Sequence, residues 1–432
     1  MTSPLLGRPG AVAGDPLGPD AGVAWHYGDP FGEQRALASG HGVVDQSHLG
    51  AIRVEGEDRL TWLNDLTTQK LDALEQGCPT EALVLSPQGH IEHAAAVVEF
   101  DGATWLITES PQRLADWLKS MRFRRDVRVS DESADWAVLG TSAPEVVWAP
   151  SASIGAEGIA AGWVDPWPRV LDGGTRYGPP AEQHPARAWG WRLLLVPRRT
   201  LEQGVADAEA AGLRLAGTWA LEALRIAAWR PRFAAEVDHR TVPHELDWLR
   251  TAVHLKKGCY RGQETIARVH NVGKPPRRLT FLHLDGSTAD LPHAGAHITV
   301  EGCEVGRVTS VTQHFELGPI ALAVIKRSIP ADALLEVELS GADEAPTTGP
   351  VAAAPPASVA AAQTVIVPVE GESADRPAPR GPLMPGLRRA GAMPSAVPGG
   401  MTGGMVGAAS APTLGGAPRS APGSVSTGMR VV

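Results

Sequence analysis

The most constraining feature of this sequence is the uneven distribution of residues that can build a core. All 13 Trp, six Phe and three Tyr occur before residue 345, whereas Pro, Gly and Ala make up 46 of the 88 residues from 345 to 432. A segment of that composition buries too little apolar surface to offset the entropy of ordering its chain. We therefore expect a disordered Ala/Pro/Gly-rich tail over residues 343–432, after a folded body long enough for two or three domains.

Charge and hydropathy exclude several classes of protein. The formal net charge is -9 and the tail is net basic, so the body is acidic and direct nucleic-acid binding is not expected. The longest apolar runs, such as 94–98, fall far short of the roughly 18 residues of a membrane-spanning helix. Residues 1–22 hold Gly and Pro throughout and no continuous apolar stretch, which predicts a flexible N-terminus and no secretory signal. We expect a cytoplasmic protein that binds no membrane.

Strand-like and helix-like patterns alternate along the body, which predicts an α+β fold. Turn residues separate the apolar runs at 81–85, 94–100 and 104–108, so these runs are expected to form an antiparallel meander. Ser110 and Pro111 supply an N-cap and a first-turn proline for a helix that ends near residue 121. Apolar residues at helical spacing predict further helices at 201–211 and 218–229.

These patterns divide the chain into units. We expect an α+β subdomain over residues 23–150, a second α+β subdomain over 151–277 and a small β-barrel or sandwich over 278–342. The last unit is predicted because short strands follow one another there, separated by turn residues.

One of the three cysteines lies where a thiol is expected to be reactive. Cys259 belongs to the segment KGCYRGQE, which runs from Lys257 to Glu264 and is followed by Arg268. Nearby cations lower the pKa of a thiol because they favour the thiolate, and a helix that begins after Gly262 would add N–H groups of the same sign. The alternative is a small residue in a tight place, beside cations that belong to a solvated face. No metal site is predicted.

The residues around Cys259 have expected roles. Lys257, Arg261 and Arg268 are expected to tune the thiolate and to contact an anionic group, and Gly258 and Gly262 permit the turn. Gln263 and Glu264 either cap the following helix or contact a ligand. Of the other cysteines, Cys78 lies in a turn, and the strand pattern around Cys303 predicts a core position.

The segment Lys257–Glu264, which includes Tyr260, and the following Arg268 together resemble the K-G-C-[FY]-x-G-Q-E-x-x-[AS]-R signature of the YgfZ-type folate-binding proteins. These proteins are relatives of the glycine-cleavage T-protein. Supporting similarity runs from about Gly42 to Leu339. The resemblance implies a cloverleaf of three subdomains around a central hole that takes tetrahydrofolate, with the folate held partly by residues 23–150. It also implies a role in the assembly or repair of iron-sulfur clusters in client proteins, including enzymes that thiolate tRNA, and allows a transient cluster.

Two departures from the T-protein pattern bear on the reaction. The stretch Gly89–His93 offers Glu92 and no Asp, where the resemblance places a hairpin with the catalytic Asp of the T-protein. Ala227 stands where that enzyme carries a folate-contacting Glu, and an alanine cannot accept hydrogen bonds from a pterin ring.

Three functions therefore remain open. The first is a folate-binding protein that supports iron-sulfur cluster assembly, with a reactive Cys259 that faces the folate. The second is a folate-dependent aminomethyltransferase of the glycine-cleavage type. The third is a non-catalytic folate sensor in which Cys259 only packs. The sequence does not predict an oligomeric state.

Overall fold

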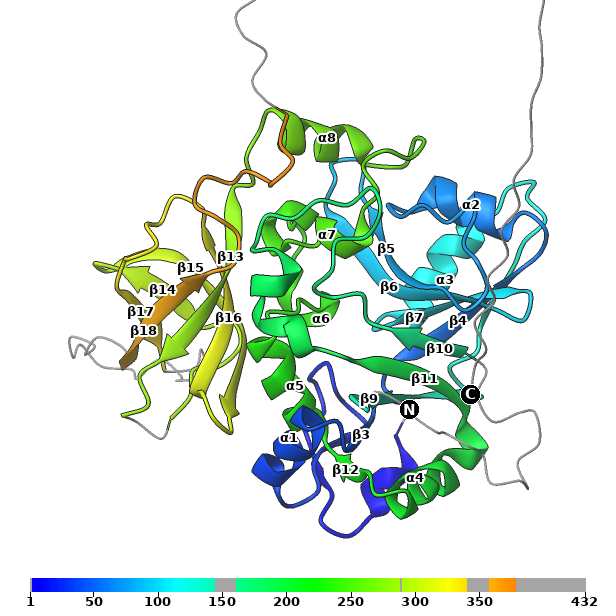
Figure 1. The fold of residues 1–432 in the computed structure, drawn as a ribbon, viewed down its shortest axis with the longest axis horizontal. Helices are drawn as coiled ribbons and strands as arrows, with labels where there is room; N and C mark the ends of the chain where they lie inside the picture. The colour runs from blue at the N-terminus through cyan, green and yellow to red at the C-terminus, as the bar shows by residue number, and fades with distance from the viewer. Residues whose placement is uncertain (1, 144–160, 288–289, 340–356, 378–432) are drawn as a thin grey trace, which may run out of the picture. The chain divides into compact units, whose positions relative to one another are not determined.

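The computed structural model describes residues 2–143, 161–287, 290–339 and 357–377. These residues belong to one compact unit, Met1–Pro379, which contains two five-stranded sheets, a small two-stranded sheet and a closed β-barrel (Figure 1). Within the described residues, no helix has both the length and the apolar character needed to cross a bilayer.

The first five-stranded sheet is antiparallel and has the strand order β5-β6-β7-β4-β8. Its strands are β4 (Gly50–Glu55), β5 (Pro79–Leu85), β6 (Ile91–Phe100), β7 (Ala103–Thr108) and β8 (Arg128–Asp131). Helices α2 (Arg59–Leu66) and α3 (Pro111–Ser120) bury Leu63, Leu114 and Leu118 against one face. The predicted meander and the predicted helix after Ser110 are confirmed.

The second five-stranded sheet has the order β10-β11-β9-β3-β12 and is antiparallel except between β12 and β3. Its strands are β3 (Gly42–Asp45), β9 (Trp136–Thr141), β10 (Ala161–Val164), β11 (Arg192–Pro197) and β12 (Arg214–Ala216). Strands from both sides of residue 150 share this sheet, so residues 23–150 and 151–277 do not each form a sheet of their own. Local patterns reveal single strands but not pairings between strands that lie far apart in the sequence.

All the remaining described helices precede the barrel in the sequence. They are α1 (Pro30–Ala38), α4 (Leu201–Ala210), α5 (Thr218–Ala227), α6 (Phe233–Glu236), α7 (Leu249–Ala252) and α8 (Gln263–Asn271). Short 3-10 turns occur at Pro4–Gly7, Ala181–Gln183, Pro185–Ala188, Arg198–Thr200 and Pro243–Leu246. Helix α5 buries Ala220, Ala223 and Ile226 and packs against both α1 and β15 of the barrel, which makes it the central support of the fold (Figure 1).

The barrel has the strand order β13-β16-β15-β14-β17-β18. Its strands are β13 (Arg277–Leu284), β14 (His297–Val300), β15 (Cys303–His314), β16 (Gly318–Lys326), β17 (Leu335–Glu338) and β18 (Ser358–Val365). Leu282, Ile298 and Ala323 are fully buried inside it. The predicted terminal barrel is confirmed.

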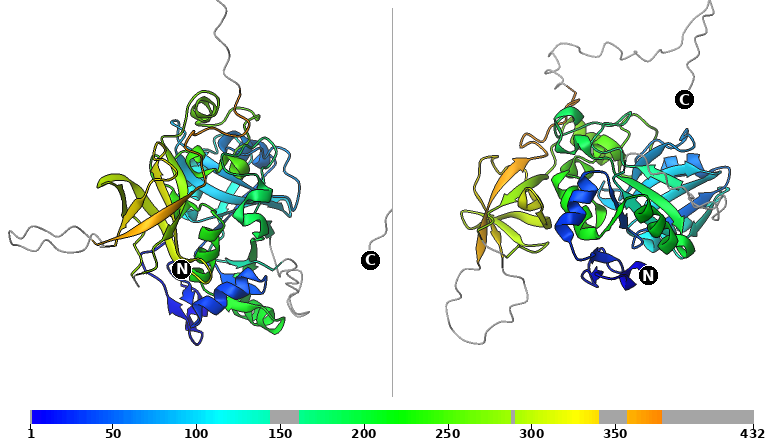
Figure 2. Two further views of the ribbon diagram at one scale, coloured as in Figure 1. Left: turned by 60° about the vertical axis from the view of Figure 1, so that its left-hand side comes forward. Right: turned by 60° about the horizontal axis from the view of Figure 1, so that its bottom comes forward.

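The barrel closes with a strand from the segment that composition predicts to be disordered. Strand β18 pairs with β13 and with β17 (Figure 2), and Ile366 and Val367 after it are almost completely buried. The prediction of a disordered tail over 343–432 is therefore wrong for this part, and the barrel does not end at residue 342. The average composition of residues 343–432 does not reveal β18, a short strand in which buried and exposed residues alternate. Residues 340–356 and 378–432 lie outside the described residues.

The N-terminal residues are packed on the body, so the prediction of a flexible segment over 1–22 is wrong. Leu5 is fully buried beside Val43 and Leu139 of the second sheet. The Ser3 amide donates to the Gly22 carbonyl at 2.8 Å, and β1 (Val12–Ala13) pairs with β2 (Ala24–His26). The Gly and Pro residues of this segment supply turns between such contacts.

Candidate ligand-binding cavity

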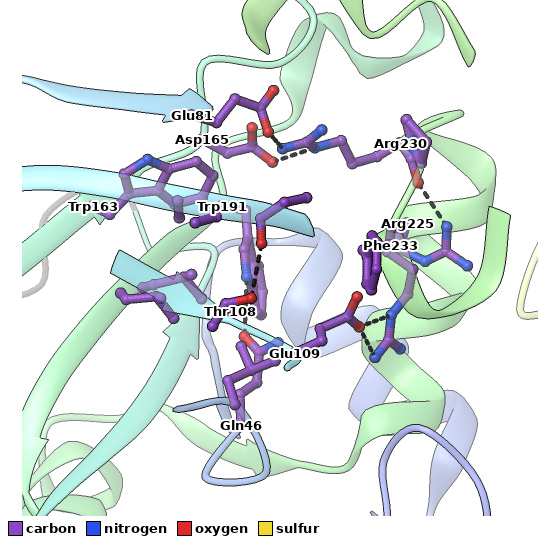
Figure 3. Close-up of a pocket in the computed structure, with 18 of the residues that line it drawn as sticks. Gln46, Glu81, Thr108, Glu109, Trp163, Asp165, Trp191, Arg225, Arg230 and Phe233 are labelled. Carbon is purple, nitrogen blue, oxygen red and sulfur yellow. Dashed lines mark hydrogen bonds and ion pairs between the residues drawn. The ribbon is translucent and has the colours of Figure 1, made fainter. Parts of the chain in front are cut away.

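A cavity that opens to solvent lies between the two five-stranded sheets, α5 and the residues that follow α5 (Figure 3). The first sheet contributes Glu81, Ala94–Ala96, Ile107 and Thr108, and β10 and β11 contribute Trp163 and Leu193. Helix α5 and the segment after it add Leu221, Glu222, Arg225, Arg230, Pro231, Arg232 and Phe233. Elements far apart in the sequence therefore form one site.

Aromatic rings make up much of the wall. Trp163, Trp189, Trp191, Phe233 and Trp248 line the cavity, and the rings of Trp189 and Trp191 stack with centroids 5.7 Å apart. Hydrogen bonds fix three of the indoles: Trp163 Nε1 donates to the Thr80 carbonyl at 2.6 Å, Trp189 Nε1 to Asp165 Oδ2 at 2.9 Å, and Trp191 Nε1 to Gln46 Oε1 at 3.2 Å. Rigid apolar faces of this kind suit a ligand with flat rings.

Arg230 is the central charged group of the cavity. Its Nη2 donates to Glu81 Oε2 at 2.7 Å and its Nε to Asp165 Oδ2 at 3.0 Å (Figure 3). Burial disfavours the cation, but the charges of Asp165 and Glu81 outweigh burial and raise the pKa of Arg230 above its usual range. Arg230 is therefore a permanent cation that is bonded through two of its three nitrogen atoms.

Two buried hydrogen-bond donors of the cavity have no acceptor among the described residues. They are Arg230 Nη1 and Trp248 Nε1. Arg230 and Trp248 are only 8% and 3% exposed, and the guanidinium carbon lies 5.8 Å from the centroid of the Trp248 ring. A buried donor without an acceptor costs roughly 1–3 kcal/mol. A ligand acceptor in contact with either atom would satisfy that donor.

A second ionic cluster neutralises the other carboxylates of the cavity. Arg232 Nε donates to Glu109 Oε1 at 2.6 Å, Arg232 Nη1 to Glu222 Oε1 at 3.0 Å, and Arg225 Nη2 to Glu222 Oε2 at 2.8 Å. Burial favours the neutral acid, yet Arg225 and Arg232 outweigh it and lower the pKa of Glu222 to about 2. Glu222 therefore stays charged and is a poor proton acceptor, and Glu109 is paired with Arg232.

The residues of the KGCYRGQE segment lie elsewhere. All are described, and neither they nor Arg268 line the cavity. Cys259 is exposed and does not line this cavity, so it is not a small residue packed in a tight place. Arg268 is exposed on α8, whereas Tyr260 is buried, and this burial raises the pKa of its hydroxyl.

The cations expected to tune the thiol have other partners. Lys257 Nζ donates to the main-chain carbonyls of Thr67 and Gln69, both at 2.8 Å, and to that of Asn64. Arg261 Nη1 donates to Glu92 Oε2 at 2.9 Å. Within the described part of the chain, the Cys259 sulfur has no hydrogen-bonding or ionic partner. The structure thus gives these two cations an anchoring geometry.

The glycines and polar residues of the segment have distinguishable roles. Gly262 has a φ of +82°, and a Cβ there would come 2.6 Å from the Ser86 carbonyl, so both backbone conformation and space favour glycine. A Cβ on Gly258 would meet nothing within 4 Å. Helix α8 begins at Gln263, whose amide contacts the Gly258 carbonyl at 3.4 Å, and Glu264 is exposed in its first turn. These positions fit the helix-start role better than ligand contact.

The other cysteines are both exposed. The turn position predicted for Cys78 is confirmed, but the core position predicted for Cys303 is wrong. Cys303 is the first residue of β15, directly after the tight turn at Glu301 and Gly302, where side chains reach solvent.

The two positions that depart from the T-protein pattern lie at different places. Glu92 lies on β6, paired with Arg261 outside the cavity. Ala227 lines a separate hollow, which shares Trp189 and Trp191 with the central cavity.

Sequence patterns alone did not identify the cavity residues. Arg230 and Arg232 alternate with aromatic residues in the run Trp229–Phe233, and Trp189 and Trp191 are two residues apart. Aromatic residues that alternate with arginines in the sequence can indicate such a site. Nothing in the sequence around Glu81 or Asp165 indicates it, because only the tertiary fold brings these residues to Arg230.

Comparison with known proteins identifies the architecture. Residues 26–149 match the GCVT N-terminal domain, and residues 277–351 match the glycine cleavage T-protein C-terminal barrel domain. The aminomethyltransferase of Thermotoga neapolitana is 28% identical over 332 residues, which cover 73% of this chain and 87% of that protein. A chloroplastic protein of Arabidopsis thaliana that is named as a transferase is 28% identical over 311 residues, and the match covers 66% of each chain, just under two thirds.

A solved structure agrees with these matches. The crystal structure of the glycine cleavage system aminomethyltransferase T from Bartonella henselae superimposes with a TM-score of 0.62 at 18% identity, covering 85% of this chain and 97% of that one. The chain therefore has the three-part α+β fold of the glycine cleavage T-protein, with its N-terminal domain and its C-terminal barrel.

Proposed function

We propose that this protein binds a reduced folate in the central cavity and supports the assembly or repair of iron-sulfur clusters in client proteins. The observation that carries the folate part is the pair of buried, unsatisfied donors, Arg230 Nη1 and Trp248 Nε1, within a wall of tryptophans. A folate has a bicyclic pterin with a ring carbonyl and ring nitrogens that accept hydrogen bonds, a second aromatic ring and an anionic tail.

The lining and the polarity of the cavity fit such a ligand. Pockets for small molecules and cofactors combine apolar walls with a few fixed polar groups. This cavity opens to solvent, where an anionic tail can leave. Arg230 and Trp248 would hold the pterin carbonyl, and the tryptophan faces would stack on the rings.

The same geometry argues against aminomethyl transfer as the main activity. Each acidic side chain that lines the cavity is bonded to an arginine: Glu81 and Asp165 to Arg230, Glu109 to Arg232, and Glu222 to Arg225 and Arg232. A general base needs a carboxylate that is free to take a proton. Glu92, the acidic residue of the hairpin, lies outside the cavity and is also paired.

The proposal assigns Cys259 to chemistry on a partner. Its sulfur is exposed on a loop outside the cavity, where a client protein can reach it. The match of KGCYRGQE to the signature of YgfZ-type proteins supports a role in cluster or sulfur handling, with any cluster held transiently and shared with the partner. Folate-dependent aminomethyl transfer is the second candidate, because the Thermotoga and Streptomyces coelicolor relatives are named aminomethyltransferases.

Two assays separate the candidates. Purified protein is incubated with tetrahydrofolate and an aminomethylated lipoyl carrier, and methylene-folate is measured; the proposal predicts no turnover above background, and turnover would favour the second candidate. In cells that lack the native protein, the activity of iron-sulfur enzymes is then compared for the wild type, Cys259→Ser and Cys78→Ser. The proposal predicts loss only for Cys259→Ser, since Cys78 is equally exposed but lies in an unrelated turn. Full activity of Cys259→Ser would contradict it.

A further inference from the structure

We propose that Lys257 is a positioning residue that holds the Cys259 loop on the end of α2, and that a buried chain of hydrogen bonds connects this anchor to Arg230, so that a ligand in the cavity changes the reactivity of Cys259. The second half rests on the proposed function, because it takes a reduced folate as the ligand.

The anchor is complete in its hydrogen bonding. Lys257 Nζ has three protons and contacts three main-chain carbonyls, those of Asn64, Thr67 and Gln69. Asn64 lies in the last turn of α2, where carbonyls lack partners within the helix and carry partial negative charge. The neighbouring Lys256 is exposed, so two adjacent lysines have different environments.

Cys259 lies between two such anchors. Two residues before it, Lys257 binds the end of α2; two residues after it, Arg261 pairs with Glu92 on β6. Gly262 then passes so close to the Ser86 carbonyl that a Cβ would lie 2.6 Å from it. The loop is therefore tied to the end of α2 before the thiol and to strand β6 after it.

Hydrogen bonds continue from the anchor to the cavity. The Gln69 carbonyl accepts from Lys257, and Gln69 Nε2 donates to the Thr251 carbonyl at 2.8 Å. Thr251 Oγ1 donates to Glu81 Oε1, while Glu81 Oε2 accepts from Arg230 Nη2 at 2.7 Å. Gln69, Glu81 and Thr251 are at most 4% exposed.

This burial gives the connection its physical meaning. Hydrogen bonds in a low-dielectric interior are strong and polarise one another, and a break leaves a buried group unpaired. A ligand acceptor on Arg230 Nη1 would hold the guanidinium, Glu81 and Thr251 in a single arrangement. The loop at the other end is then expected to become more rigid, and Cys259 less reactive.

The test measures the rate of Cys259 alkylation with and without tetrahydrofolate. The chain has three cysteines, so a Cys78→Ser, Cys303→Ser parent leaves Cys259 as the one thiol. Saturating tetrahydrofolate, verified by calorimetry, is expected to slow alkylation by iodoacetamide about fivefold, the lower end of usual coupling between sites.

Four variants of this parent locate the coupling. Gln69→Met removes the amide but keeps the carbonyl that Lys257 uses, and Thr68, which donates to the Ala252 carbonyl at 2.6 Å, still holds this segment. Tetrahydrofolate should bind Gln69→Met as it binds the parent but no longer slow alkylation. Lys257→Met should lose the folate effect and raise the basal rate, with partial rescue in Lys257→Arg, whereas Lys256→Met should match the parent.

The possible failures are distinguishable. If the parent binds tetrahydrofolate without any change in alkylation, or if Gln69→Met and Lys257→Met keep the full effect, the inference is wrong. If the parent binds no tetrahydrofolate, the proposed function fails instead. In that case the rate of amide hydrogen exchange over residues 256–262 tests the Lys257 anchor separately from folate binding. Faster exchange in folded Lys257→Met than in the parent supports the anchor, and an unchanged rate overturns it. If Lys257→Met does not fold, Lys257→Gln, which has only two donor protons and no charge, is used for the same comparison.

Discussion

Arg261 Nη1 lies 2.9 Å from Glu92 Oε2, and this ion pair joins the loop of Cys259 to strand β6. The sequence presents Arg261 as a cation for a thiol and Glu92 as the acid of a catalytic hairpin. In the fold they are partners of each other, at a site distinct from the cavity. The pair thus explains why the signature loop and the cavity are separate parts of the molecule.

Removal of this pair should cost little stability. Both side chains are 35% exposed, and exposed ion pairs contribute about 0–1 kcal/mol. We expect Glu92→Gln to lower the free energy of unfolding in urea by less than about 1 kcal/mol, and to leave tetrahydrofolate binding unchanged. Glu264→Gln, at an exposed position of α8, is the control. A tenfold loss of affinity in Glu92→Gln would show that the ligand reaches this pair.

Trp248→Phe removes an N–H group that has no acceptor in the described structure but keeps most of the ring. If this donor serves the ligand, tetrahydrofolate affinity should fall by roughly threefold to tenfold, the value of one hydrogen bond, while the free energy of unfolding stays the same or rises.

Trp163→Phe is the matched contrast to that variant. Its indole donates to the Thr80 carbonyl at 2.6 Å, so the substitution leaves a buried carbonyl unpaired and should destabilise the protein by about 1 kcal/mol or more. Calorimetry and urea unfolding of both variants check the pattern. Equal loss of stability in the two variants would contradict a ligand role for Trp248.

Stability should fall as the pH is lowered below about 6.5. His244 is fully buried, its Nε2 lies 3.1 Å from the Ile266 carbonyl, and burial lowers its pKa to about 3. The unfolded state takes up a proton near pH 6.5, and the folded state only near pH 3. The contribution of His244 is therefore complete above 6.5 and is lost towards pH 3, by about 1.4 kcal/mol per pH unit.

His244→Gln should remove one proton from the uptake on unfolding. The free energy of unfolding in urea, measured between pH 6.5 and pH 4, should therefore depend less steeply on pH, by about 1.4 kcal/mol per pH unit. Burial lowers the pKa of His184 to about 3 as well, so part of the slope should remain. His239→Gln, at an exposed position, is the control. A slope in His244→Gln equal to that of the wild type would contradict the assignment.

The barrel should depend on β18. A chain that ends at residue 357 loses this strand and the buried Val359, Ile366 and Val367, and it leaves β13 and β17 with open edges. We expect its thermal unfolding temperature to fall sharply, since each buried aliphatic side chain contributes about 1.5–3 kcal/mol. A chain that ends at residue 377 keeps β18 and should unfold close to the full-length protein. Equal unfolding temperatures for the two truncations would contradict the closed barrel.

Sequence reasoning succeeded where structure is local. Turn residues and periodicity were enough for the meander of β5 to β7, for α3 and α5 and for the strands β13 to β17 of the barrel. It failed where the structure depends on pairing between strands that are far apart in the sequence. Strand β3 pairs with β9 and β12, and β18 closes the barrel from within a low-complexity segment. The site shows the same division, because the motif around Cys259 is contiguous, whereas Arg230 meets Glu81 and Asp165 only in the folded chain.

The most direct test of the central claim is a crystal structure of the protein grown with tetrahydrofolate. The account predicts the pterin in the cavity between Trp163, Trp191 and Trp248, with one of its acceptor atoms within hydrogen-bonding distance of Arg230 Nη1. A pterin bound against Cys259 or in another hollow of the molecule, with Arg230 Nη1 still unpaired, would contradict it.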